Sequence, residues 1–109
     1  MEFSKAVRKK LRQIIEKGLQ REYAIGLEKA ESVIRDWRQK APDDHRDHYL
    51  LLFKTIRDFD KHIARRYDIM RGSTYVFIVM QQLDDGVISL DDLEELPEEV
   101  RNLIVNFRG

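Results

Sequence analysis

The sequence predicts an all-α protein: a long antiparallel helical hairpin with a compact C-terminal helical head, forming a dimer. Apolar residues recur every three or four positions along most of the 109 residues, which is the period of an amphipathic helix. The segment APDD at 41–44 divides the hairpin, because proline disfavours a helical conformation in the residue before it. The apolar run at 75–80 has no second strand-like segment to pair with, so it is also expected to be helical.

The first helix is expected to run from Ser4 to about Lys40, a length of about 50 Å. Gly18 and Gly26 interrupt it at a cost of about 1 kcal/mol each relative to alanine, so each should mark a bend or the close approach of another backbone. A helix of this length exceeds what the rest of a small chain can cover, so the sequence predicts a homodimer. The residues expected at the dimer interface are Leu27, Ala30, Ile34, Trp37 and Tyr49.

The second helix is expected from about Asp44, capped by Asp43 or Asp44, to Met70. Together the two helices form an extended hairpin over 1–70. The remaining residues, 71–109, form the helical head of the same single domain, 1–109.

Three helices are expected in the head. Ser73 is predicted to cap the first, which contains the apolar run and ends at Gly86. Ser89 and Asp92 have capping-box spacing, and they open a short helix that carries residues 93–96. Pro97 starts the last helix.

The apolar run is expected to form a helix that is buried nearly all round. Phe77 is the exception, and we expect it to be at least partly exposed as an anchor for a partner. The residues expected in the interior are Val76, Ile78, Val79, Met80 and Leu83.

Charge is balanced overall but is unevenly distributed along the chain. Residues 1–40 carry 11 basic and 6 acidic side chains, a balance of +5, whereas residues 84–109 carry 2 basic and 8 acidic side chains, a balance of −6. This asymmetry favours head-to-tail contact between like chains over nucleic-acid binding, since no compact basic block is present. Nucleic acid would otherwise contact Lys5, Arg8, Lys9, Arg12 and Arg21.

Composition excludes several classes of site. The chain has no cysteine, and therefore no disulfide, no thiolate nucleophile and no zinc site built on sulfur. The apolar run is far shorter than the roughly 20 residues of a membrane span. The first residues lack the pattern of a signal peptide, so we expect a cytoplasmic protein with no membrane span.

Neither a metal, a cofactor nor a catalytic site is expected. DGVISLDDL at 85–93 resembles the second half of an EF-hand loop, but Gln81 and Leu83 occupy the first ligand positions. His45 and His48 are three residues apart, a spacing that permits a shared metal, but the pattern is weak and solvated polar residues at a helix start are the favoured interpretation. His62 is expected to be a partly buried structural histidine. No nucleophile lies beside a base, so the sequence does not predict an enzyme.

A family resemblance rests on residues 65–107 and on their spacing. Its motif consists of Tyr67-Asp68, Arg71, Ser73, Phe77-Ile78-Val79, Gln81, Leu83, Gly86, Val87-Ile88, Leu93, Leu96 and Ile104. In order and spacing these residues resemble the fluorescence recovery proteins, small all-helical regulators of cyanobacteria. The resemblance implies a dimeric helical hairpin with a helical head. It also implies a non-enzymatic regulator that binds the orange carotenoid protein, or a related carotenoid-binding domain, and promotes its return to the inactive form in photoprotection.

The resemblance also implies partner-binding residues. Phe77 matches a functional phenylalanine in the head of the family. The second helix aligns in two ways, and both stay open. Without gaps, Leu50 takes the position of a tryptophan, Phe53-Lys54 that of a His-Asp pair and Asp60 that of an arginine. A shift of one turn instead sets Arg57-Asp58-Phe59 against His-Asp-Phe, with Phe53 near the tryptophan. The alternative function is a nucleic-acid-binding module or another protein-interaction module with an unknown target.

Overall fold

The fold was taken from a computed structural model, which describes residues 3–107. These residues form α1 (Lys5–Lys40), α2 (Arg46–Tyr67), α3 (Tyr75–Asp84), the 3₁₀ helix η1 (Leu90–Leu93) and α4 (Glu98–Phe107). No strand occurs within this part of the chain, which confirms the predicted all-α class.

Side-chain and backbone bonds fix both ends of α1. At the start, the hydroxyl of Ser4 accepts a hydrogen bond from the backbone N–H of Val7 at 3.2 Å, as an N-cap serine does. At the end, Ala41 adopts a left-handed conformation with φ 43° and donates its N–H to the carbonyl of Trp37. Pro42 follows and cannot continue the helix.

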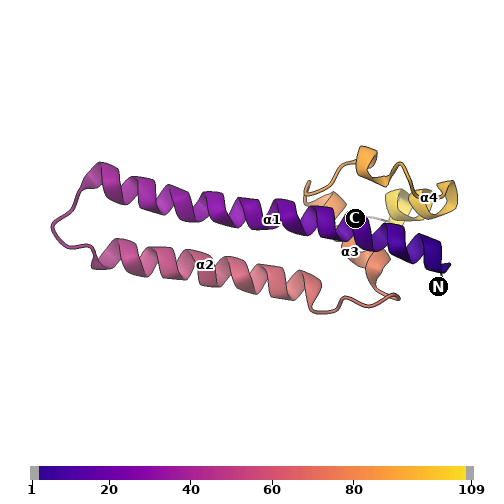
Figure 1. The fold of residues 1–109 in the computed structure, drawn as a ribbon, viewed down its shortest axis with the longest axis horizontal. Coiled ribbons are helices and arrows are strands. Elements are labelled where there is room, and N and C mark those ends of the chain that lie inside the picture. Colours follow the sequence, from indigo (N-terminus) through magenta and orange to yellow (C-terminus); the bar gives the residue numbers. More distant parts are fainter. Residues whose placement is uncertain (1–2, 108–109) are drawn as a thin grey trace.

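α1 and α2 lie side by side and run in opposite directions, and the turn that joins them is at the far end from the head (Figure 1). Near this turn Asp36 contacts His48, and near the head Glu22 contacts His62. The described chain is elongated, with extents of 59 × 24 × 23 Å.

The head consists of α3, η1 and α4, which pack around the first half of α1 (Figure 1). Its core therefore crosses the expected boundary between hairpin and head at residue 70. The buried members of this core are Leu11, Ile14, Ile15, Tyr75, Val76, Ile78, Val79, Leu83, Ile88, Leu93, Leu96, Val100 and Ile104.

Two helix boundaries in the middle of the chain differ from the prediction. α2 begins at Arg46 and ends at Tyr67, so it is shorter at both ends than the expected 44–70. Asp44 lies before the helix, where its carboxylate accepts the N–H of Arg46 at 2.9 Å. Thr74, and not Ser73, precedes α3. The hydroxyl of Thr74 accepts the N–H of Arg71 and donates to the carbonyl of Ile69, so threonine organises this turn.

The segment after α3 also differs in detail. Gly86 ends the helix as predicted, with a φ of 73° that glycine adopts without strain. The capping box between Ser89 and Asp92 is present, but the short helix covers 90–93 and not 93–96. The hydrogen bonds here join residues three apart, as in a 3₁₀ turn. Pro97 lies just before α4, and its carbonyl accepts the N–H of Arg101.

α3 is buried on most, but not all, of its circumference. Val76, Ile78, Val79 and Leu83 are buried as predicted. Met80 is only half-buried, so that part of the prediction was wrong; it lies on the same stripe as Phe77, which is 59% exposed. The exposure of Phe77 confirms the predicted position of this side chain on the surface of the head.

Both glycines inside α1 make room for side chains from other helices. The sequence had predicted a bend or the close approach of another backbone at these positions. A methyl group on Gly18 would lie 2.3 Å from Nε2 of Gln82, which is wholly buried. A methyl group on Gly26 would lie 2.7 Å from the ring of Phe59. Each glycine therefore allows a close contact that alanine would prevent.

We expect Gly18→Ala to destabilise the protein by about 1 to 3 kcal/mol, although alanine favours an exposed helix by about 1 kcal/mol. The new methyl group would displace Gln82 from its bonds to Ile15 and Tyr67. Chemical denaturation measures the effect. In a Gln82→Ala background the methyl group has space, so Gly18→Ala should no longer destabilise; an unchanged penalty there would contradict this explanation.

Candidate functional site

One face of the hairpin exposes a continuous stripe of apolar side chains from both helices, here called the hairpin face. It includes every residue that the sequence predicted at a dimer interface. Leu27 and Tyr49 protrude furthest, and each is 72% exposed. The stripe consists of Tyr23, Leu27, Ala30, Ile34 and Trp37 from α1 and Tyr49, Phe53 and Ile56 from α2.

The hairpin face contains two hollows. The tip hollow, of about 370 Å³, lies near the turn and is lined by Val33, Ile34, Trp37, Arg38, His45, His48, Tyr49 and Leu52. The base hollow, of about 350 Å³, lies nearer the head and is lined by Tyr23, Gly26, Leu27, Ala30, Ile56, Phe59, Asp60 and Ile63. Gly26 and the Phe59 ring that packs against it both line the base hollow.

Contacts link several of the predicted partner-binding residues of α2. Lys54 and Arg57 pair with Asp58 at 3.4 and 3.8 Å, and the guanidinium group of Arg57 lies over the ring of Phe53. Leu50, Lys54 and Arg57 follow one another at helical spacing and are exposed. Phe53 and Asp60 lie seven residues apart on the side of the hairpin face. Asp58 lines a groove on the other side of the hairpin.

Phe77 lies in a different place, on the head. It lines a groove of about 400 Å³, here called the head groove, which no residue of α2 lines. Phe107 is also strongly exposed there, at 73%. The lining residues are Phe3, Ser73, Val76, Phe77, Met80, Leu103 and Phe107.

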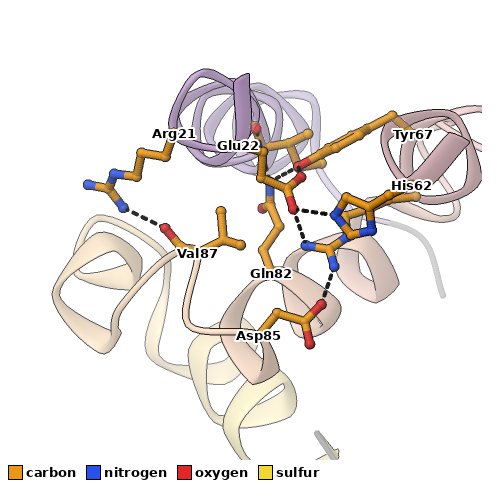
Figure 2. A network of polar contacts seen from close by, with 9 residues as sticks. Arg21, Glu22, His62, Tyr67, Gln82, Asp85 and Val87 are labelled. Carbon is orange, nitrogen blue, oxygen red and sulfur yellow. Dashed lines mark hydrogen bonds and ion pairs between the residues drawn. The ribbon is translucent and has the colours of Figure 1, made fainter. Parts of the chain in front are cut away.

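A buried cluster of polar side chains joins α1, α2 and α3, and we call it the polar junction (Figure 2). Its centre is Glu22, which is 2% exposed. The carboxylate accepts a hydrogen bond from the hydroxyl of Tyr67 at 2.6 Å and lies 2.9 Å from Nε2 of His62. Arg66, also buried, forms ion pairs with Glu22 at 2.9 Å and with Asp85.

Gln82 extends the polar junction into the head (Figure 2). Its Nε2 donates both to the carbonyl of Ile15 at 3.0 Å and to the hydroxyl of Tyr67 at 2.8 Å. Burial, together with the carboxylate of Glu22, raises the pKa of Tyr67, so its hydroxyl stays protonated and can donate.

The opposite side of the hairpin has a groove of about 640 Å³ directly over the polar junction. It is lined by both signs of charge and by apolar side chains, so no single ligand class fits it by charge. The lining residues are Glu22, Ile25, Lys29, Thr55, Asp58, Phe59, His62, Arg66, Asp85 and Val87.

Part of the charge asymmetry is matched within one chain, through Asp92. Lys17 and Arg21 of α1 pair with Asp92 at 3.0 and 2.7 Å. Arg12 donates to the hydroxyl of Tyr75, and Lys10 donates to a backbone carbonyl of the acidic segment. Two of the five candidate nucleic-acid contacts, Arg12 and Arg21, are therefore bonded within the fold.

The two histidines near the turn bind different neighbours. His45 accepts a hydrogen bond from Nε1 of Trp37 at 2.9 Å, and His48 lies 3.0 Å from the carboxylate of Asp36. His48 and then Lys40 lower the pKa of Asp36. Within residues 3–107 the structure brings together no group of three His, Cys, Asp or Glu residues of the kind that holds a metal ion.

Sequence reasoning missed the polar junction. One signal was present: Glu22 follows Leu11, Ile15 and Gly18 at helical spacing, so a carboxylate occupies a position in line with core residues. A charged residue in such a position needs buried partners. Which partners it finds depends on the tertiary structure.

Comparison with models of protein families, with curated proteins and with solved structures finds no match for this chain. Its function is therefore argued from the surfaces described above. Within residues 3–107, no helix combines the length and the apolar character needed to cross a membrane.

We expect Asp92→Asn to destabilise the head by about 1 to 2 kcal/mol at neutral pH, because Asp92 serves both the capping box and the ion pairs with α1. Arg21, together with the N–H of Ser89 and with Lys17, holds the pKa of Asp92 well below its usual value. A depressed pKa contributes stability that is present above the unfolded value, about 3.9, and is lost as pH falls through the folded value. Denaturation of both proteins as a function of pH should therefore show a difference that shrinks below about pH 4.

Proposed function

We propose that this protein is a non-enzymatic, homodimeric regulator that acts by binding another protein. The observation that carries the proposal is the hairpin face, where large apolar side chains of both helices are exposed beside two hollows. Contiguous exposed apolar surface of this kind is typical of a protein interface.

The amount of exposed surface supports a dimer. A compact monomer of 13.0 kDa would expose about 6,300 Å², whereas this chain exposes 7963 Å². Its radius of gyration is 17.8 Å, compared with about 13 Å for a compact domain of the same length. The excess area exceeds the roughly 800 Å² that each partner contributes to a typical interface.

The two hollows suggest how a second copy would fit. Contacts of Asp36 with His48 and of Gly26 with Phe59 show which parts of α1 and α2 lie level with each other. Tyr49 is therefore level with Asp36. An antiparallel pair with its two-fold axis near Ala30 and Phe53 would place the protruding Tyr49 of one copy over Gly26 in the base hollow of the other.

The same arrangement also buries Leu27, the other strongly exposed side chain, and pairs opposite charges across the interface. Leu27 of one copy would enter the tip hollow of its partner. Arg38 lines the tip hollow and Asp60 lines the base hollow, so each arginine would face an aspartate across the interface. A parallel pair would bring like charges together at both ends. Antiparallel packing therefore accounts for apolar shape and for charge at once.

We expect Arg38→Glu and Asp60→Lys each to weaken the dimer, by about tenfold in dissociation constant, because each creates a like-charge pair with its partner. The double variant restores opposite charges and should regain most of the affinity. Sedimentation equilibrium measures all three proteins, with Glu28→Lys as a control charge reversal at an exposed residue that lines neither hollow. A double variant no stronger than the weaker single variant would exclude this register, and a monomeric wild type would exclude the dimer.

The head groove is the surface that we assign to the regulated partner. Phe77 offers an exposed aromatic anchor there, and aromatic side chains are enriched among the residues that dominate binding energy. The resemblance to fluorescence recovery proteins supports the orange carotenoid protein, or a related carotenoid-binding domain, as that partner. In the antiparallel dimer the two head grooves would lie at opposite ends, each free to bind.

We expect Phe77→Ala to weaken binding of the orange carotenoid protein by roughly tenfold or more while lowering stability by under about 1 kcal/mol, since a core phenylalanine would cost about 3 to 5 kcal/mol. Fluorescence titration and thermal unfolding measure the two effects. Leu90→Ala, which removes another exposed apolar side chain of the head, is the matched control. If the wild type fails to bind, this partner is wrong; if Phe77→Ala unfolds the head, its assignment as a surface anchor is wrong.

A further inference from the structure

α2 is attached to the rest of the chain mainly at its C-terminal end. Of its 22 residues only Ile63 and Arg66 are buried, and both lie in its last two turns. α1 likewise has no buried residue beyond Glu22. Outward from the polar junction, the two helices are therefore joined only by half-buried side chains and by surface contacts such as that of Asp36 with His48.

At this end α2 is held by polar contacts, by the buried side chain of Ile63 and by the ring of Phe59, which packs at Gly26 of α1. The buried head core contains no residue of α2, and Tyr67 alone packs against it from a partly buried position. By contrast, the polar junction contacts α2 through His62, Arg66 and the hydroxyl of Tyr67. The bonds that hold α2 in place can thus be broken without removing any side chain of the head core.

We infer that the polar junction is a latch that holds α2 against α1. With the junction intact, α2 is docked and the hairpin is closed. With it broken, α2 separates from α1 as one unit while the head keeps its fold, because the head core is complete without α2.

The bonds of the junction depend on one another, as a latch requires. The hydroxyl of Tyr67 accepts from Gln82 and donates to Glu22, so its loss removes one hydrogen bond from each of these two buried groups. Oε1 of Gln82 already lacks a hydrogen-bond partner among the described residues. Because an unpaired buried polar group is costly, removal of one member weakens the whole cluster.

The latch gives the head a means to control the hairpin face, and this step rests on the proposed homodimer. Three of the eight residues of the hairpin face belong to α2, so release of α2 would remove Tyr49 and Phe53 from the surface that a second copy binds. Asp85, at the end of α3, and His62 line the groove above the junction and remain reachable from solvent. A change in the bonds of Asp85 or His62 at this groove would therefore affect the dimer through α2.

The test is Tyr67→Phe, which removes one hydroxyl and keeps the aromatic ring. Amide hydrogen exchange is measured at a protein concentration below that of dimer formation. We expect exchange to rise by about tenfold or more across 48–63 of α2 and to stay unchanged at Ile78, Val79 and Ile104 of the head core. Tyr75→Phe is the matched control, because that hydroxyl accepts bonds from Arg12 but does not contact α2, and it should leave α2 unchanged.

Two results would overturn the latch. Exchange of α2 in Tyr67→Phe equal to that of the wild type would show that the junction does not hold this helix. An equal rise in α2 and in the head core would show that hairpin and head open as one unit. Sedimentation of the same samples at higher concentration tests the coupling separately: a monomeric wild type refutes the homodimer but leaves the exchange result, and thus the latch, to stand or fall independently.

Discussion

The structure depends on α1, which packs against the head along its first part and beside α2 along the rest. Glu22 lies between these two parts of the helix. Before Glu22, the inward side chains of α1 are apolar, and the head covers them. After it, no residue of α1 is buried, and the helix runs beside α2 to the turn (Figure 1). A buried carboxylate at this point must be paired, and its donors come from α2. The pairing of Glu22 therefore sets where the hairpin joins the head.

The helices could be predicted from the sequence because their apolar period is regular and several of their ends are fixed by local chemistry. Gly86 and the Ser89–Asp92 pair act within a few residues of themselves, so their effects are visible in the sequence. The turn before α3 was mispredicted because Ser73 and Thr74 are both residues that can organise a turn, and the hydroxyl that bonds to the backbone of Ile69 and Arg71 is that of Thr74.

The candidate surfaces were predictable to different degrees. The exposure of Phe77 was predicted from the family resemblance and from the role of aromatic anchors in binding. The apolar stripe of the hairpin face follows directly from helical spacing. The hollows and the polar junction do not, since they depend on which residues of two or three helices lie level. Gly26 illustrates the difference. The sequence shows only a glycine that destabilises a helix, whereas the structure shows that the Phe59 ring packs against this glycine beside a hollow.

Along α1 the interactions change in kind and in strength. The first half is enclosed in apolar packing, which is the strongest stabilising term available to a chain without disulfides. The middle is held by a few buried polar bonds, whose net contribution is modest when complete and whose loss is costly. The last part is half-covered and exposes apolar side chains. Stability should therefore fall from the head toward the turn, so that the part of the chain best suited to bind a second copy is also the part that gains most from binding it.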